Sequence, residues 1–211
     1  MIKTLNGKWN YRIGKGEWTT KVVPFSELCV GHSECRKYFD LEHFDDTILL
    51  KFDGITYNAN VYLNDNFLGK MLPYSEYTFD ITSIAKAKSN LLQVQLEDVD
   101  CPFGPSEGWE NYGGICRDVS VIYKNECYIK DVYFHSCFEN DYRDATYTVE
   151  VGTSGECEYR VTLSDGGRVV DTYVANSTME RKIKNVLPWS VVDPHLYGLR
   201  VELLDKAGNV T

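Results

Sequence analysis

The sequence lacks the patterns that most directly identify membrane, metal-binding and nucleic-acid-binding proteins. No stretch approaches 18 consecutive apolar residues, so no membrane span is expected. The four histidines are dispersed, and no cysteine pair has the C-x-x-C spacing of zinc sites, so neither a metal nor a cofactor is expected. A net charge of −9 without a long basic run disfavours nucleic acid and anionic membranes as partners.

Cysteines are present, but they lack the spacing of a disulfide framework. There are seven of them, an odd number, at positions 29, 35, 101, 116, 127, 137 and 157. We therefore expect all seven to be free thiols, as in a reducing compartment. The N-terminus also lacks an apolar signal region, and both features together predict a cytoplasmic protein.

Helical patterns are almost absent, whereas strand patterns recur throughout the chain. The one plausible helical turn is Ile81–Ala87, which Asp80 or Thr82 could cap. Apolar runs typical of strands cover residues 8–13, 36–41, 47–52, 59–63, 91–96 and 119–123. A turn cluster at residues 64–66 predicts a hairpin. Regularly spaced strands without helices indicate an all-β fold of the antiparallel sandwich type.

A second set of strands follows a boundary near Asn125. The runs cover residues 129–138, 145–151, 157–164, 168–175, 178–186 and 197–204. The sequence Ser164-Asp165-Gly166-Gly167 predicts a hairpin turn between two of them. Such dense strand spacing is typical of an immunoglobulin-like β-sandwich. We therefore predict two domains, residues 1–125 and residues 126–211.

The most informative segment is Asn111-Tyr112-Gly113-Gly114-Ile115-Cys116-Arg117. The two glycines allow a turn that side chains would block, and the arginine offers a planar fork of donors. Glu107-Gly108-Trp109-Glu110 comes just before it, and aromatic and carboxylate side chains on one loop can hold a sugar. A tight turn with a structural arginine is the alternative interpretation.

The segment with its continuation, Asn-Tyr-Gly-Gly-Ile-x-Arg-Asp-Val, resembles the signature that closes the N-terminal domain of glycoside hydrolase family 2 enzymes. These enzymes are β-galactosidases, β-glucuronidases and β-mannosidases. Other motifs resemble that family in the same order: Leu5-Asn6-Gly7-Lys8-Trp9, Val23-Pro24, Arg36-Lys37-Tyr38-Phe39, Phe52-Asp53-Gly54-Ile55, Ala59-Asn60-Val61-Tyr62-Leu63-Asn64, Leu68-Gly69, Tyr74, Asp80-Ile81-Thr82, and Trp189, Pro194, Leu196 and Tyr197. The motifs span almost the whole chain.

Some positions depart from the family pattern. Asp65 replaces a glycine, Leu72-Pro73 replaces a Gly-Gly pair, and Glu76 replaces a proline. Phe25 stands where a histidine is common, and Cys35 replaces an aromatic residue. None of these changes threatens the fold, but they make the sugar substrate harder to assign.

The resemblance implies a jelly-roll, galactose-binding-like β-sandwich over residues 1–125 and an immunoglobulin-like β-sandwich over residues 126–211. In such enzymes a (β/α)₈ barrel follows and holds both catalytic carboxylates. The 211 residues have no alternating strand and helix pattern and cannot also hold a barrel of roughly 250 residues. The chain is therefore expected to be inactive alone, with a β-glycoside substrate and a downstream barrel as partners and a homo-oligomer left open.

The predicted substrate-binding residues lie just before the signature and at its first position: Glu107, Trp109, Glu110 and Asn111. In family members this loop can reach the mouth of the barrel's active site. Catalysis by Glu107 and Glu110 themselves is disfavoured, because two acids on one mobile loop are rarely held at the required separation. Arg117 and Asp118 are expected to form a strand-end ion pair or a backbone clamp. Trp189 is expected to pack with Pro194 and Tyr197 in the core and corner of the second domain.

Two hypotheses of different classes follow. The first is a non-catalytic, N-terminal portion of a family 2 β-glycosidase that supports the barrel and shapes its carbohydrate pocket. The second is a free-standing carbohydrate-binding or adhesive β-sandwich protein. Both predict that the chain does not hydrolyse glycosides, and a coding region continuing into a barrel would decide between them.

Overall fold

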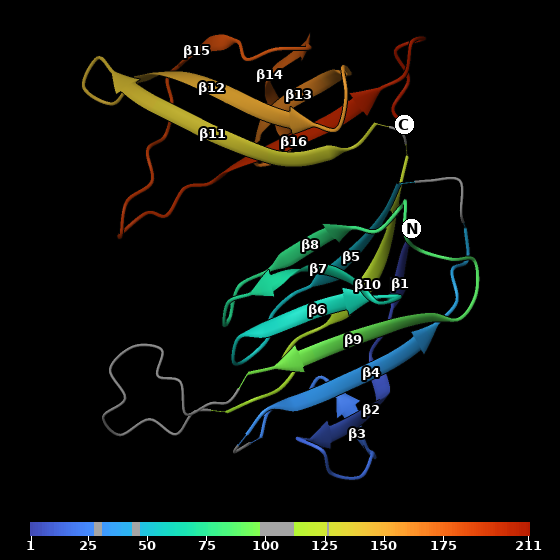
Figure 1. The fold of residues 1–211 in the computed structure, drawn as a ribbon. Helices are drawn as coiled ribbons and strands as arrows, with labels where there is room; N and C mark the ends of the chain where they lie inside the picture. Colours follow the sequence, from blue (N-terminus) through green and yellow to red (C-terminus); the bar gives the residue numbers. More distant parts are fainter. Residues whose placement is uncertain (28–30, 44–46, 98–111, 126) are drawn as a thin grey trace. The chain divides into compact units, whose positions relative to one another are not determined.

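The computed structural model describes residues 1–27, 31–43, 47–97, 112–125 and 127–211 of the chain. These residues form strands and turns but no helix, so the prediction of an all-β fold is confirmed (Figure 1). No helix capable of crossing a membrane therefore occurs among them. Contacts between Cα atoms divide the chain into two compact units, Met1–Asn125 and Glu126–Thr211.

The first unit contains two antiparallel sheets (Figure 1). The larger sheet has the order β3-β2-β4-β9-β6-β7, with bounds Thr19–Val23, Gly7–Ile13, Ser33–Phe39, Asn90–Leu96, Ala59–Leu63 and Asn66–Met71. The smaller sheet has the order β1-β10-β5-β8, with bounds Ile2–Thr4, Val119–Lys124, Thr47–Phe52 and Tyr77–Asp80. One apolar core draws on both sheets, which makes the unit a β-sandwich.

Buried and more exposed side chains alternate along the strands, so each sheet buries one of its faces. In β6 and β10 every second residue is fully buried and the intervening residues are partly exposed. Trp9 on β2 is only 1% exposed, and its indole nitrogen donates a 2.8 Å hydrogen bond to the Leu5 carbonyl. A buried indole needs such a partner, because an unpaired polar group is costly in an apolar core.

The local turns follow the sequence predictions. Strands β6 and β7 form a hairpin in which Leu63 faces Asn66, and the two turn residues Asn64 and Asp65 have φ values of 50° and 67°. These values are typical of a type I′ turn, which asparagine and aspartate tolerate. The predicted helical turn is a single hydrogen-bonded turn, in which the amide of Ala85 donates to the Ile81 carbonyl at 2.9 Å.

The second unit contains two three-stranded antiparallel sheets (Figure 1). One has the order β11-β12-β15, with bounds Ile129–Glu139, Asp144–Thr153 and Glu180–Lys184. The other has the order β14-β13-β16, with bounds Arg168–Ala175, Glu158–Asp165 and Tyr197–Leu204. The predicted turn at Gly166-Gly167 joins β13 to β14, where Asp165 faces Arg168.

A polar network joins the two sheets of the second unit. Asp171 on β14 accepts a 2.9 Å hydrogen bond from the hydroxyl of Tyr147 on β12. It also accepts two 2.8 Å hydrogen bonds from the guanidinium of Arg181 on β15. Tyr147 is only 1% exposed, so Asp171 provides the partner that its buried hydroxyl requires.

The structure corrects the prediction of seven free thiols. Cys127 and Cys157 form a disulfide, with Cα atoms 6.7 Å apart and a sequence separation of 30. Backbone and side-chain hydrogen bonds between Tyr128 and Ser154 bring the two segments together. Spacing along the chain could not reveal this pair, because strand pairing and not local sequence makes the two cysteines neighbours. Cys116 and Cys137 are free, Cys35 is buried and takes no part in this disulfide, and Cys29 and Cys101 lie outside the described residues.

The prediction that Trp189 packs in the core of the second unit is also wrong. Its side chain is 56% exposed, and Leu196 close by in sequence is 75% exposed. Tyr197 does form the corner that the sequence predicts, because its hydroxyl accepts a 2.9 Å hydrogen bond from the Leu187 amide. The apolar residues between 187 and 196 therefore project outward from a hydrogen-bonded corner.

Candidate functional site

The two glycines of the signature segment form backbone pairs with two separate segments of the first unit. Gly113 exchanges two backbone hydrogen bonds with Glu27, of 2.8 and 3.0 Å, and Gly114 pairs with Thr56. The Thr56 hydroxyl also donates a 2.6 Å hydrogen bond to the Tyr112 carbonyl. Gly114 has a φ of 153°, a backbone conformation that favours glycine. The two signature glycines thus connect separate segments of the first unit through backbone hydrogen bonds.

Arg117 contacts the backbone, as one of the two predicted roles requires, whereas the Asp118 side chain bonds another side chain. The Arg117 side chain lies over Gly54, and its guanidinium approaches the Asp53 carbonyl at 3.5 Å. The Asp118 carboxylate accepts a 2.9 Å hydrogen bond from the Asn6 side chain. Asn6 belongs to the opening motif of the chain, so the opening and closing motifs hold each other in place.

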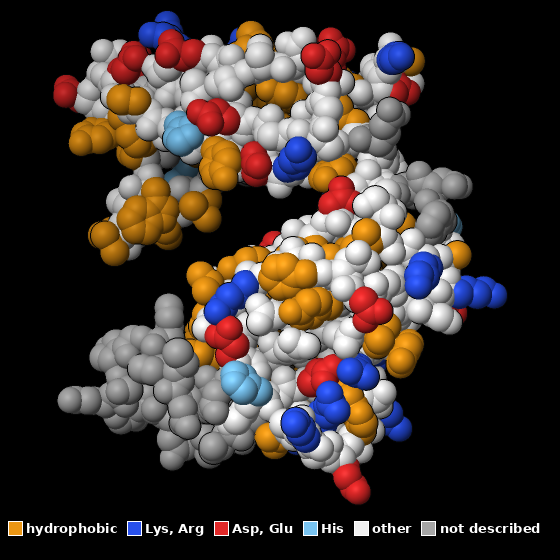
Figure 2. Space-filling model, viewed as in Figure 1, with side chains coloured by type: hydrophobic (Ala, Val, Ile, Leu, Met, Phe, Trp, Pro, Cys, Tyr) orange, Lys and Arg blue, Asp and Glu red, His pale blue; other side chains and the backbone are white. Residues whose placement is uncertain are grey.

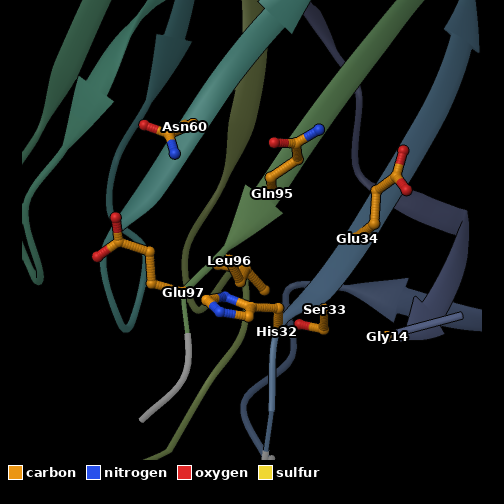
Figure 3. A pocket seen from close by; sticks show the side chains of 8 residues that line it. All are labelled: Gly14, His32, Ser33, Glu34, Asn60, Gln95, Leu96 and Glu97. Atoms are coloured by element: carbon orange, nitrogen blue, oxygen red, sulfur yellow. The ribbon is translucent and has the colours of Figure 1, made fainter. Parts of the chain in front are cut away.

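A polar cavity of about 470 Å³ lies at one end of the larger sheet (Figure 3). Three of its residues lie side by side on neighbouring strands. Glu34 on β4 and Asn60 on β6 are both paired with Gln95 on β9. Residues directly opposite each other on antiparallel strands point to the same side of the sheet. The full lining is Gly14, His32, Ser33, Glu34, Asn60, Gln95, Leu96 and Glu97.

Glu34 is the most constrained carboxylate of this cavity. It is 8% exposed and accepts 2.6 Å hydrogen bonds from both Arg12 and Arg36 and a weaker one from Gln93 at 3.3 Å. Burial by itself would raise the pKa of Glu34, but the hydrogen bonds from the arginines and Gln93 outweigh it, so the pKa is lowered. Glu34 is therefore an ionised acceptor at neutral pH. Trp18 lies beside both guanidinium groups, 4.5 and 4.6 Å from its ring centre.

Glu97 is the second carboxylate of the cavity. It pairs with Lys70 at 2.7 Å and accepts a 2.8 Å hydrogen bond from the Asn58 side chain. The hydrogen bond from Lys70 is the main reason that the pKa of Glu97 is lowered, although burial opposes it. The positive potential of His32 contributes in the same direction. Both cavity carboxylates are thus held in the ionised form.

The side-chain amides of Asn60 and Gln95 complete the cavity. Neither amide has a hydrogen-bond partner within the described part of the chain, so each offers a free donor and a free acceptor. Free amides beside ionised carboxylates suit the hydroxyl groups of a sugar. No group of three or more histidine, cysteine or acidic residues that could hold a metal ion occurs in the described ranges.

The four predicted substrate-binding residues, Glu107, Trp109, Glu110 and Asn111, lie outside the described residues. Glu97 is the last described residue before that segment, and Tyr112 is the first after it. Glu34 and Gln95 were not predicted as site residues, and Asn60 was noted only as part of a family motif. Asn60 and Gln95 occupy outward positions of alternating strands, but only the pairing register places them in one row with Glu34.

Two family models match the chain. The model described as glycosyl hydrolase 2 galactose-binding domain-like matches residues 31–100. The model described as glycosyl hydrolases family 2 matches residues 127–211. The cavity residues from His32 to Glu97 fall within the first match, and nearly all of the second unit falls within the other.

Two individual proteins that are similar to this chain are named β-galactosidases. A β-galactosidase of Thermoanaerobacter pseudethanolicus is 28% identical over 194 residues, which are 80% of this chain and 25% of that protein. A β-galactosidase of Alteromonas mediterranea is 25% identical over 183 residues, 75% of this chain and 17% of that protein. The chain therefore spans a quarter or less of these two relatives.

Solved structures share the fold. The structure of a β-glucuronidase from Ruminococcus gnavus in complex with D-glucaro 1,5-lactone has a TM-score of 0.77 and 22% sequence identity. The similarity covers 99% of this chain and 43% of the R. gnavus chain. A β-glucuronidase from an uncultured Clostridium species has a TM-score of 0.78, with 96% of this chain and 42% of that one covered.

Proposed function

The chain belongs to glycosyl hydrolase family 2, and we propose that it supports the catalytic barrel of a β-glycosidase and shapes the carbohydrate pocket of that barrel. In this proposal residues 1–125 form the jelly-roll sugar-binding-type domain and residues 126–211 the immunoglobulin-like domain. The bond cleavage itself belongs to the barrel, which the 211 residues do not contain. The cytoplasmic location is kept as part of the proposal, although the Cys127–Cys157 disulfide weighs against it.

The observation that carries the proposal is that both halves of the chain match domains of the same glycosidase family. The polar cavity supports it further, because two ionised carboxylates and two free amides line the end of the sheet from which residues 98–111 continue. In the proposal these cavity groups and the segment with Glu107, Trp109, Glu110 and Asn111 contact the sugar together. The free-standing adhesive protein, our second hypothesis, has no observation of its own in its favour.

The test is kinetic and uses the longer natural protein in which this chain occurs. This longer protein should hydrolyse at least one aryl β-galactoside, β-glucuronide or β-mannoside. Trp109→Ala and Glu110→Ala should each lower kcat/KM by at least about tenfold, or roughly 1.4 kcal/mol of transition-state binding. Asn10→Ala, an exposed amide on β2 outside the cavity lining, is the matched control and should be neutral. Wild-type kinetics in both loop variants would remove the loop from the proposal.

A further inference from the structure

The outward side of the larger sheet carries a row of polar and aromatic side chains beside the cavity. The row crosses four strands, from Arg36 on β4 through Gln93 on β9 and Tyr62 on β6 to Phe67 on β7. Paired residues point to the same side of a sheet, and neighbouring strands lie about 4.8 Å apart, so the four side chains form a continuous track. None of them is acidic or aliphatic, and none lines the cavity.

Aromatic rings lie at both ends of this row. At the β7 end, Phe67 is 58% exposed, and its ring centre lies 5.2 Å from that of Tyr62. At the β4 end, Trp18 is 39% exposed and lies beside the guanidinium groups of Arg12 and Arg36. Figure 2 shows this face, with hydrophobic side chains over β6 and β7 and Lys and Arg side chains over β2 and β4. Exposed flat rings of this kind can stack on the faces of sugar rings.

The guanidinium of Arg36 has hydrogen-bonding capacity left over. Its Nε donates to Glu34, and its two terminal nitrogens have no partner within the described part of the chain. Arg12 donates to the same carboxylate, so two positive charges share one negative charge. Lys70 and Glu97 pair with each other at the other side of the cavity. These three cations and two anions leave a local charge of +1, although the chain carries −9.

We propose that this face binds an oligosaccharide that carries acidic groups, either carboxylate or sulfate. The free terminal nitrogens of Arg36 match two oxygens of such a group, because a guanidinium binds planar or tetrahedral oxyanions through paired donors. Trp18 and Phe67 stack on sugar rings to either side of it. The inference goes beyond the proposed function, because the face needs no barrel in order to bind, and it would hold a polymer while the barrel cleaves it.

Charge and composition favour an acidic oligosaccharide over other occupants. Salt screens charges more than about 8–10 Å apart, so sparse acidic groups on a sugar respond to the local positive charge and not to the whole chain. The dense phosphates of a nucleic acid would extend beyond this patch and meet the net charge of −9. The row also lacks the aliphatic side chains that a protein partner would cover.

The experiment presents residues 1–211 to an array of uronate-containing, sulfated and neutral tetrasaccharides and titrates the strongest ligand by calorimetry. Acidic tetrasaccharides should be retained in preference to neutral ones, and the uronate and sulfated classes show which acidic group is recognised. Arg36→Gln and Phe67→Ala should each weaken binding at least about tenfold, which is about 1.4 kcal/mol. Arg168→Gln and Tyr133→Ala, at exposed positions of the second unit, are the matched controls and should bind like wild type.

Phe67 is more than half exposed, so its variant should keep the wild-type melting temperature, and a loss of binding there cannot come from unfolding. Neutral tetrasaccharides retained as strongly as acidic ones, no retention at all, or face variants that bind like the controls would overturn the inference. Tighter binding of single-stranded DNA than of any acidic tetrasaccharide would overturn it as well. Hydrolysis of aryl β-glycosides by the longer natural protein is read separately. Hydrolysis without retention refutes this inference alone, whereas retention without hydrolysis refutes the proposed function alone.

Discussion

At the scale of single residues, Gly114 occupies a position that no other residue can take without distortion. Its φ of 153° is unfavourable for any side chain, and an added Cβ would lie 3.1 Å from the Phe25 carbonyl carbon and closer still to its oxygen. Because those atoms are backbone, they cannot move aside cheaply. We predict that Gly114→Ala destabilises the protein by about 2 kcal/mol or more, measured by urea unfolding.

The control for this prediction is Gly155→Ala. A Cβ at Gly155 meets no atom within 4 Å, and its φ lies outside the left-handed region. The change should stay within about 0.5 kcal/mol of wild type. Equal stability of the two variants would show that the signature turn tolerates a side chain.

The structure gives physical reasons for several residues of the family motifs. Asn6 accepts a 3.0 Å hydrogen bond from the Val119 amide and so joins the opening motif to the closing strand. Asn64 accepts a 3.0 Å hydrogen bond from the Leu91 amide and donates to Asn90. These contacts could not be read from the sequence, because they join residues far apart along the chain. The motifs predicted the family correctly, but most of the motif residues described here stabilise the sandwich.

At the scale of elements, the contact between the two sheets of the second unit depends on Asp171. Asp171→Asn keeps the shape of the side chain but leaves the Arg181 guanidinium without its charged partner and weakens the bond from Tyr147. We predict a loss of about 2–3 kcal/mol at pH 7. The measurement is urea unfolding, with Asp141→Asn in an exposed turn as the control that should be neutral.

The same variant has a predictable pH dependence. Hydrogen bonds from Arg181 are the main cause of the lowered pKa of Asp171, and burial opposes them. A carboxyl group whose pKa is lowered on folding stabilises the protein above its unfolded pKa of about 3.9 and stops doing so as pH falls through the folded value. The difference between wild type and Asp171→Asn should therefore shrink below about pH 4. A constant difference down to pH 2 would contradict this role.

The number of free thiols, measured by thiol titration, tests for the disulfide. Under denaturing, non-reducing conditions the protein should show at most five free thiols, and seven after reduction. Because the bond closes a loop of 30 residues, the chain-entropy estimate of its contribution is roughly 3–4 kcal/mol. Cys127→Ser should lower the stability of the second unit accordingly. Seven thiols in unreduced protein would show that the pair is open.

The strands themselves were largely predictable from the sequence. Apolar runs placed β5, β6 and β9 within a residue of their observed bounds, because the apolar pattern of a strand is a local signal. Strands β1, β3 and β8 were missed, because these segments of three to five residues carry too little apolar periodicity. The exposure of Trp189 was unpredictable for another reason, since a sequence shows that a side chain is apolar but not whether its partner is present.

At the scale of the whole molecule, the candidate site was only partly predictable. The sequence located a carbohydrate loop at residues 107–111, which lie outside the described residues, so that expectation stays a prediction. The cavity formed by Glu34, Asn60 and Gln95 depends on the register of three strands, which no local pattern specifies. The two sites adjoin along the chain, and that adjacency is the reason to test them together.

The carboxylates of the described cavity cannot carry out glycoside hydrolysis by themselves. A glycosidase needs one carboxyl group that stays protonated near neutral pH, so that it can act as the general acid. Here the pKa values of Glu34 and Glu97 are both lowered, each by a basic partner within 2.7 Å. Neither group can therefore donate a proton to the leaving oxygen of a glycoside at pH 7.

We therefore predict that purified residues 1–211 do not release nitrophenol from aryl β-galactosides, β-glucuronides or β-mannosides above the uncatalysed rate. Enzymes accelerate such reactions by at least about 10⁶-fold, so even weak catalysis would be visible against that background. Turnover that copurifies with the chain would contradict the prediction if it disappears in Glu34→Gln, Glu97→Gln, Glu107→Gln or Glu110→Gln. Turnover that survives all four substitutions would instead indicate a contaminating glycosidase, because no carboxylate of either candidate site would then contribute.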